Sequence, residues 1–143
     1  MLTRRAATLT DVDFIYALRE AGYRQHVEVL FGPWLEPAQR AFLARDMDET
    51  PYEIVLEDEV AVGTIAVARH ADHDLLEDIL VAPANRDRGI GTRLMHALMA
   101  EARARGVPLR LSVLDGNRVR ALYDRLGFRV TLTVPPRTKM EWP

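Results

Sequence analysis

The apolar residues of this chain recur with the alternating period of strands in some segments and with the longer period of helices in others. Helical periodicity begins at the capping pattern Thr10-Asp11-Val12-Asp13 and returns after Pro37, after Arg88 and after Asn117. The predicted strands are residues 2–8, 52–56, 60–69, 75–81, 109–114, 128–134 and 138–142. The pattern therefore predicts the element order β-α-α-β-β-β-α-β-α-β-β.

Turn and cap residues set the expected ends of these elements. The acidic turn at residues 57–59 joins two strand-like runs as an antiparallel hairpin, and Gly106 ends the long helix predicted for residues 88–105. A short helix capped by Asn117 is expected to end at Gly127. After Gly22 the apolar pattern becomes irregular, so residues 23–37 are predicted to connect the first two helices.

Length and composition narrow the class of protein. With 143 residues, 48% of them hydrophobic, the chain is predicted to form a single domain over residues 1–143 that buries its own core. No apolar run approaches the ~20 residues of a membrane span, and the N-terminus lacks the apolar stretch of a signal peptide. We therefore expect a cytoplasmic protein with no membrane partner.

Charge and cysteine content exclude several kinds of chemistry. A net charge of −2 argues against a nucleic-acid partner. The absence of cysteine excludes disulfides, thiolate metal sites and an acyl-cysteine intermediate. His70 and His73 flank a turn without a third distant ligand, so no metal site is predicted.

A glycine-rich turn joins an apolar strand to the start of the long helix. Its glycines, Gly89 and Gly91, let the backbone approach a ligand, and the first N–H groups of the helix have no internal partners. These groups and the helix dipole favour an anion such as a pyrophosphate. A Walker loop is excluded because Thr92-Arg93 follows Gly91, and a dinucleotide fingerprint is excluded because Leu94 occupies the place of its third glycine.

Two motifs resemble those of the GNAT superfamily of N-acetyltransferases. Arg-x-x-Gly-x-Gly at residues 86–91, preceded by Val-x-Pro at 81–83, is similar to the acetyl-CoA loop of that superfamily. The segment from Asn117 to Phe128 resembles its Asn-x-x-Ala-x-x-Leu-Tyr-x-x-x-Gly-Phe motif. The resemblance covers nearly the whole chain and implies an α/β (α+β) GNAT fold. This is a mixed, mostly antiparallel sheet that is splayed at its centre and has helices on both faces.

The same resemblance implies that acetyl-CoA is the co-substrate and that no metal is needed. Backbone groups of Ile79 and Val81 would pair with the pantetheine amides, while the N–H groups of residues 86–92 would hold the pyrophosphate. Asp87 departs from the family pattern, which often has glycine here, and its carboxylate is expected to point into water. The implied cofactor-binding residues are Ile79, Leu80, Val81, Arg86, Arg88, Gly89, Ile90, Gly91, Thr92, Asn117 and Tyr123.

Acetyl transfer to an amine needs a base for the amine and an acid for the thiolate. Tyr123 matches the general acid of the family, and Glu77 is our first choice as base. The stretch around Glu77 resembles that of spermidine/spermine and thialysine N-acetyltransferases, where this glutamate is the base. Strand alternation would point Asp78 to the opposite face, and a bulge near Leu80 would reverse the choice between these two carboxylates. A water relay is a further alternative.

The acceptor is expected to lie against the segment between the first two helices. Arg24, His26, Glu28 and Trp34 are the predicted substrate-binding residues, and Tyr23 and Phe31 of the same segment are further candidates for substrate selection. Glu28 or His26 could bind an ammonium or act as the base instead, and Arg24 suits a carboxylate. These side chains could also simply pack the helix junction or face water.

The sequence thus predicts an enzyme that moves an acetyl group from acetyl-CoA to a primary amine of a small molecule or an amino acid. The amine would attack directly in a ternary complex. The alternatives are a protein or peptide N-acetyltransferase and a non-catalytic acetyl-CoA sensor. A homodimer is compatible with the edge that the final strand pair offers.

Overall fold

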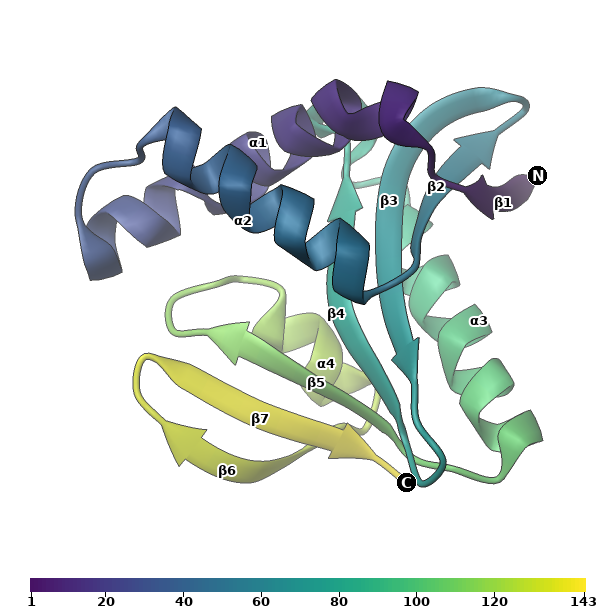
Figure 1. Cartoon of the computed structure of the whole chain (residues 1–143). Coiled ribbons are helices and arrows are strands. Elements are labelled where there is room, and N and C mark those ends of the chain that lie inside the picture. The colour runs from purple at the N-terminus through teal and green to yellow at the C-terminus, as the bar shows by residue number, and fades with distance from the viewer.

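The computed structural model describes residues 1–143 and has helices on both sides of one mixed sheet (Figure 1). The elements are β1 (Leu2–Ala6), α1 (Val12–Phe31), α2 (Glu36–Glu49), β2 (Tyr52–Glu57), β3 (Val60–Arg69), β4 (Asp74–Val81), α3 (Ile90–Arg105), β5 (Leu109–Leu114), α4 (Arg120–Arg125), β6 (Arg129–Val134) and β7 (Arg137–Trp142). This order matches the predicted one. None of the helices combines the length and the apolar character that crossing a bilayer requires.

The sheet has the strand order β1-β2-β3-β4-β5-β7-β6 and is antiparallel except between β4 and β5. These two parallel strands pair only at their beginnings, where residues 74–76 face residues 109–111. Beyond Leu76 they separate toward their C-terminal ends, as Figure 1 shows. The predicted α/β sheet, mostly antiparallel and splayed at its centre, is confirmed.

Two apolar cores lie on opposite faces of this sheet. The larger packs α3 and α4 against the strands and includes Met95 and Leu98, both fully buried. The smaller packs α1 and α2 against β2 and β3 and includes Ile15, Leu43 and Ile54. Each helix is therefore held by an apolar stripe that meets one face of the sheet.

Helix α1 is longer than the sequence pattern predicts. It continues through Gly22 to Phe31, so the prediction that residues 23–37 form an irregular connection is wrong for most of that segment. A β-carbon on Gly22 would stand 2.8 Å from Cδ2 of Leu80, which shows that glycine permits close packing of α1 on β4. The helix ends instead at Gly32, whose φ of 103° lies in the region that favours glycine.

The start of α1 also differs from the prediction. The capping pair is Thr8 and Asp11, which caps the 3₁₀ turn Leu9–Asp11 that leads into α1, and not the pair beginning at Thr10; the Asp11 carboxylate accepts the N–H of Thr8 at 2.8 Å. Arg5 donates twice to the same carboxylate, at 2.8 and 2.9 Å. The end of β1 and the start of α1 are thereby joined by charged hydrogen bonds.

Candidate active site

The separation of β5 leaves one edge of β4 without a strand partner. Ala82 donates its N–H to a carbonyl of β3 at 2.8 Å, and Leu80 pairs with Thr64 in the same ladder. In an antiparallel ladder the intervening residues direct their main-chain groups to the other side. Ile79 and Val81 therefore present their N–H and C=O groups to the split, where an extended amide-bearing ligand could add to the sheet.

The loop before α3 forms a concentrated set of hydrogen-bond donors. No N–H group from Asp87 to Thr92 donates to a protein acceptor, whereas Arg93 donates to the carbonyl of Gly89 as the helix begins. Gly89 has a φ of 78°, and a β-carbon on Gly89 or on Gly91 would meet no protein atom within 4 Å. The donors, the helix dipole and the open space together suit an anionic phosphate group.

The side chains around this loop have different tasks. Arg86 donates through Nε to the carbonyl of Val81 at 3.2 Å, and Arg88 binds Glu57 at 2.8 Å. Ile90 is buried in the larger core and anchors the start of α3. The exposed Asp87 has a φ of 61°, a strained conformation for a residue other than glycine.

Leu80 and Asn117, two of the predicted cofactor-binding residues, have structural contacts of their own. Leu80 is buried, with its main chain facing β3 and its side chain against Gly22. Asn117 accepts the N–H of Val119 at 3.0 Å and so shapes the turn before α4. Asn117 also lines a hollow of about 370 Å³ beside the C-terminal end of β5, together with Arg118 and the buried Thr138.

Tyr123 brings a free hydroxyl group to the site from α4. Tyr123 is 4% exposed, and its ring packs against Phe128 with 5.7 Å between the ring centroids. The hydroxyl makes no hydrogen bond with the protein. Every fully buried polar side-chain atom has a partner, so the unpartnered hydroxyl of Tyr123 must be accessible to solvent. Burial, followed by the negative charge of Asp78, raises the pKa of Tyr123 above its usual value of 10. Tyr123 therefore stays protonated and can donate a hydrogen bond to a ligand.

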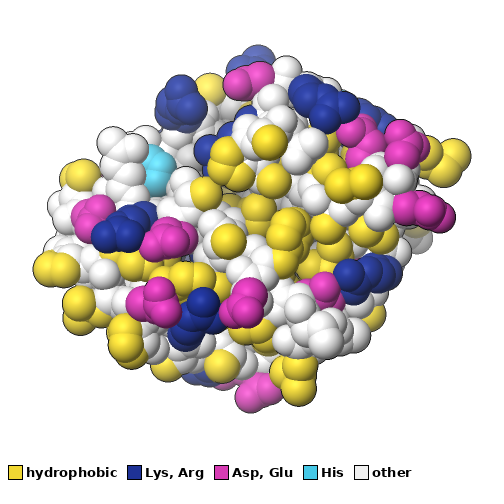
Figure 2. Space-filling view, turned by 90° about the horizontal axis from the view of Figure 1, so that it is seen from above, with side chains coloured by type: hydrophobic (Ala, Val, Ile, Leu, Met, Phe, Trp, Pro, Cys, Tyr) yellow, Lys and Arg dark blue, Asp and Glu magenta, His cyan; other side chains and the backbone are white.

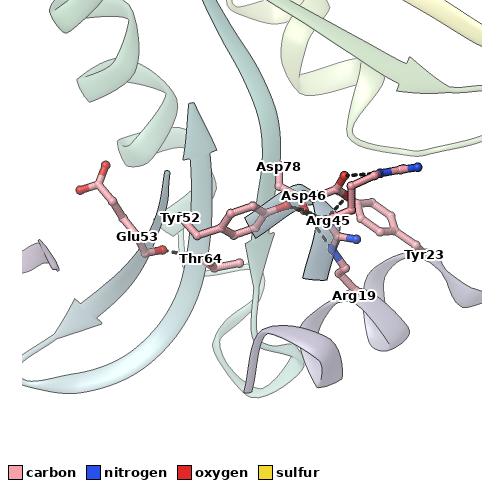
Figure 3. A network of polar contacts seen from close by, with 8 residues as sticks. All are labelled: Arg19, Tyr23, Arg45, Asp46, Tyr52, Glu53, Thr64 and Asp78. Carbon is pink, nitrogen blue, oxygen red and sulfur yellow. Dashed lines mark hydrogen bonds and ion pairs between the residues drawn. The ribbon is translucent and has the colours of Figure 1, made fainter. Parts of the chain in front are cut away.

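Asp78 is the centre of a buried polar network (Figure 3). Arg19 and Tyr23 from α1 and Tyr52 from β2 all converge on its carboxylate. Tyr23 donates to Oδ1 at 2.5 Å, Tyr52 donates to Oδ2 at 2.8 Å, and Nη2 of Arg19 lies 3.0 Å from Oδ2. Arg19 also binds Asp46 of α2 at 2.8 Å. The network ties both helices of one layer to the strand at the split.

A β-bulge at Glu77 determines which residues of β4 face each layer. Asp78 pairs with Ala66 and Leu76 pairs with Val67, so Glu77 has no partner on β3. Leu76 packs in the larger core, whereas Asp78 bonds to residues of α1 and β2 on the other face. The bulge lies at Glu77 rather than near Leu80, and it interrupts the strict alternation on which the sequence analysis relied.

Glu77 differs from Asp78 in its surroundings. Its side chain is exposed and forms no ion pair or hydrogen bond with the protein. Partial desolvation, then the neighbouring carboxylates of Asp46 and Asp78, raise the pKa of Glu77 above its usual value of 4.5. A carboxylate with a raised pKa and no partner can accept a proton, whereas the oxygens of Asp78 already accept three donors.

No hydrogen bond links the predicted acceptor-binding residues to Tyr123. Trp34 is 8% exposed, belongs to the smaller core and donates to the hydroxyl of Tyr16 at 2.9 Å. Arg24 pairs along α1 with Glu20 at 2.9 Å and with Glu28 at 3.5 Å. His26 is half-buried on the same helix. Arg24 and Glu28 therefore neutralise each other on the helix surface.

Arg19 and Tyr52 were not predicted as site residues, and Tyr23 was predicted only as one of several candidates for substrate selection. One signal was present in the letters, because Ile15, Arg19 and Tyr23 recur every four residues on one face of α1. An arginine within an apolar helix stripe needs a buried carboxylate as its partner. The periodicity of the helix could not show that this carboxylate is Asp78, which lies 59 residues further along the chain.

The molecular surface on the side of α1 has a mixed character. Figure 2 shows hydrophobic side chains gathered at the centre of this view, with acidic and basic side chains around them. Exposed apolar residues of α1 and its connection to α2 include Val29, Phe31 and Leu35. This part of the surface thus offers both apolar and charged groups to a ligand.

The splayed sheet, the strand edge open at its split and the donor loop at the start of α3 define the class of acyl-CoA-dependent acyltransferases. The model of the acetyltransferase (GNAT) family matches residues 13–128, and the chain belongs to this family. It is therefore an acetyltransferase that uses an acyl-CoA donor, as the sequence predicted. Comparison with curated protein sequences finds no match.

Solved structures with the same fold have different names and acceptors. PaiA N-acetyltransferase from Thermoplasma acidophilum, in complex with coenzyme A, is 17% identical with a TM-score of 0.73, over 99% of this chain and 98% of that one. An alanine N-acetyltransferase of a ribosomal protein from Escherichia coli is 22% identical with a TM-score of 0.72, over 100% and 94%. Aminoglycoside 6'-acetyltransferase type Ii is 17% identical with a TM-score of 0.72, over 99% and 96%. At these identities the likeness is one of fold.

Proposed function

We propose that this protein is an N-acetyltransferase that moves an acetyl group from acetyl-CoA to a primary amine of a small molecule or an amino acid. The amine attacks directly while both substrates are bound. The observation that carries this proposal is the free hydroxyl of Tyr123, held beside the split in the sheet and within the influence of Asp78. A protein that only bound acetyl-CoA would have no use for such a proton donor.

The chain has the groups needed to hold acetyl-CoA, which would supply a reactive acetyl thioester. Ile79 presents its main-chain N–H and C=O, and Val81 its N–H, to an amide-bearing chain along the split, while the carbonyl of Val81 accepts Arg86. The unpartnered N–H groups from Asp87 to Thr92 suit the pyrophosphate. Recognition would thus rest mainly on the backbone, which makes most side chains of the loop replaceable.

Two proton transfers must accompany the reaction. Deprotonating an alkyl ammonium of pKa about 10.4 near pH 7 costs roughly 4 to 5 kcal/mol, so a base is needed. Glu77 is the proposed base because its carboxylate is exposed, unpaired and has a raised pKa. Tyr123 is the proposed acid that protonates the leaving thiolate, whose pKa is about 8.5.

Thiol release from acetyl-CoA, measured across a panel of acceptors, tests this proposal. The panel contains polyamines, amino acids, aminoglycosides and peptides with free N-termini, and calorimetry measures acetyl-CoA binding in the same sample. Turnover with small amines or amino acids supports the proposal. Turnover only with peptides would replace it by a peptide N-acetyltransferase, and tight binding without any turnover would indicate a sensor. Absence of acetyl-CoA binding would overturn the assignment of residues 79–92 as the cofactor site.

A further inference from the structure

The two oxygens of the Asp78 carboxylate accept different numbers of hydrogen bonds. Oδ2 lies 3.0 Å from Nη2 of Arg19 and accepts the hydroxyl of Tyr52 at 2.8 Å, while Tyr52 itself accepts a second bond from Arg19. Oδ1 accepts only the hydroxyl of Tyr23, at 2.5 Å. Arg19 and Tyr52 thus fix the orientation of the carboxylate, and its other oxygen aims at Tyr23.

The hydroxyl of Tyr23 is left as a polarised acceptor. It gives its only proton to Asp78, and its oxygen accepts no hydrogen bond from the protein. A carboxylate that pulls on the phenolic proton increases the negative charge on the phenolic oxygen. An N–H group of a ligand is the natural partner of such an oxygen.

The ionised side chains of the Asp78 network carry a net negative charge, which favours a cation at this hydroxyl. The carboxylates of Asp78 and Asp46 share one buried guanidinium, that of Arg19, which leaves one negative charge in excess. Arg45 lies 3.7 Å from Asp46, but its side chain is 62% exposed and its charge is largely solvated. The exposed Glu77 carboxylate is a further negative charge close to Asp78.

Tyr23 and Tyr123 approach the site from the two different layers. Asp78 precedes Ile79, whose main chain faces the split, and it influences the proton affinities of both tyrosines. Tyr123 is itself among the groups that raise the pKa of Tyr23, although burial is the main cause. The hydroxyl of Tyr23, bonded to Asp78, is therefore held beside Ile79 at the start of the open edge of β4.

We propose that Tyr23 holds the acceptor nitrogen, and that the preferred acceptor is a primary alkylamine without a neighbouring carboxylate. This inference rests on the proposed function and narrows its acceptor. The oxygen of Tyr23 accepts an N–H of the amine and orients its lone pair, while Asp78 is a positioning residue that acts through Tyr23. The excess negative charge would repel a carboxylate on the acceptor. Arg24, the residue predicted to bind such a carboxylate, is already paired with Glu20 and Glu28.

A pair of matched variants tests this proposal. Tyr23→Phe and Tyr52→Phe each remove one tyrosine hydroxyl that donates to Asp78, but only the first removes the proposed acceptor contact. The probe is n-butylamine, titrated by calorimetry into the protein with coenzyme A present, with glycine as the carboxylate-bearing comparison. We expect Tyr23→Phe to weaken n-butylamine binding about tenfold and Tyr52→Phe to weaken it less than about threefold. We also expect the wild type to bind glycine more weakly than n-butylamine.

Three outcomes would overturn the proposal: no binding of n-butylamine to the wild type, equal weakening in both variants, or tighter binding of glycine. Thermal unfolding of both variants controls for a loss of folded protein. Thiol release with n-butylamine, measured in parallel, separates this inference from the proposed function. Binding that depends on Tyr23 without turnover of any amine would overturn the enzyme assignment alone. Turnover that Tyr23→Phe leaves unchanged would overturn the role of Tyr23 alone.

Discussion

The carbonyl oxygen of Leu80 on β4 lies so close to Gly63 on β3 that a β-carbon on Gly63 could not fit without moving the backbone. Gly63 is therefore required where β3 meets the end of β4. The obstructing atom belongs to the main chain, so a rotamer change cannot relieve the overlap. This close approach sets the position of the strand edge that faces the split.

We expect Gly63→Ala to lower the free energy of unfolding by about 1 to 3 kcal/mol, because overpacking forces the two strands apart. Urea unfolding measures this change. The same displacement should weaken acetyl-CoA binding, which calorimetry checks. A variant as stable as the wild type would contradict the close contact between Gly63 and Leu80.

Gly91→Ala is expected to raise the stability of the free protein and to lower its affinity for acetyl-CoA. A β-carbon at this position meets no protein atom within 4 Å, and alanine in a helix is about 1 kcal/mol more favourable than glycine. The free protein should therefore become more stable while acetyl-CoA binds more weakly, because the added methyl group occupies the space left for the phosphate. Unfolding in urea and calorimetry measure the two effects. Unchanged acetyl-CoA affinity would show that the ligand does not approach Gly91.

Tyr123→Phe should remove the proton donor with little effect on the fold. The hydroxyl has no protein partner, so its loss should change the free energy of unfolding by less than about 0.5 kcal/mol. We expect kcat to fall about a hundredfold, since general acid catalysis commonly contributes that much. Acetyl-CoA affinity should stay within about threefold. Equal turnover in the variant would remove Tyr123 from the mechanism.

The pH profile of turnover tests Glu77 as the base. Burial and nearby carboxylates raise the pKa of Glu77 above 4.5, and only the deprotonated form can accept a proton. Wild-type kcat/KM should therefore fall as the pH drops through this raised pKa. Glu77→Gln should lower kcat and remove that acidic limb, while Glu77→Asp should retain it. A variant Glu77→Gln with an unchanged profile would assign the limb to another group.

Asp11 should contribute a pH-dependent part of the stability. Hydrogen bonds from Arg5, and next the backbone bond from Thr8, lower the pKa of Asp11 from 3.8 to about 2 against the opposing effect of burial. The lowered pKa means that the stabilisation is fully present above about pH 4 and is lost as the pH falls toward about 2. Because the Arg5 side chain is 47% exposed, we expect only ~1 kcal/mol.

Comparing the wild type with Asp11→Asn isolates this contribution. The difference in free energy of unfolding, measured with urea, should be largest at neutral pH and should shrink on acidification. A difference that is constant with pH would mean that the carboxylate has the same pKa in the folded and unfolded states.

Features that depend only on residues close together in the sequence could be predicted from the sequence alone. The donor loop from Arg86 to Thr92 is such a feature, because a helix start after Gly89 leaves N–H groups unpaired whatever else surrounds it. The C-terminal end of α3 is another, since Gly106 adopts a φ of 72°. One prediction that failed was the end of the first helix at Gly22, because this glycine is needed for contact with Leu80, which is distant in the sequence.

The sequence by itself determined the order of the elements, the family and the phosphate-type loop, because periodicity, caps and unpaired helix N–H groups are local properties. Only the tertiary structure decided that Asp78 is enclosed and Glu77 is free. That difference comes from a bulge, and a bulge exists only in the pairing of β4 with β3. It likewise decided that Arg19, Tyr23 and Tyr52 meet at one carboxylate, since the burial of charge selects partners across space and leaves no fixed spacing along the chain.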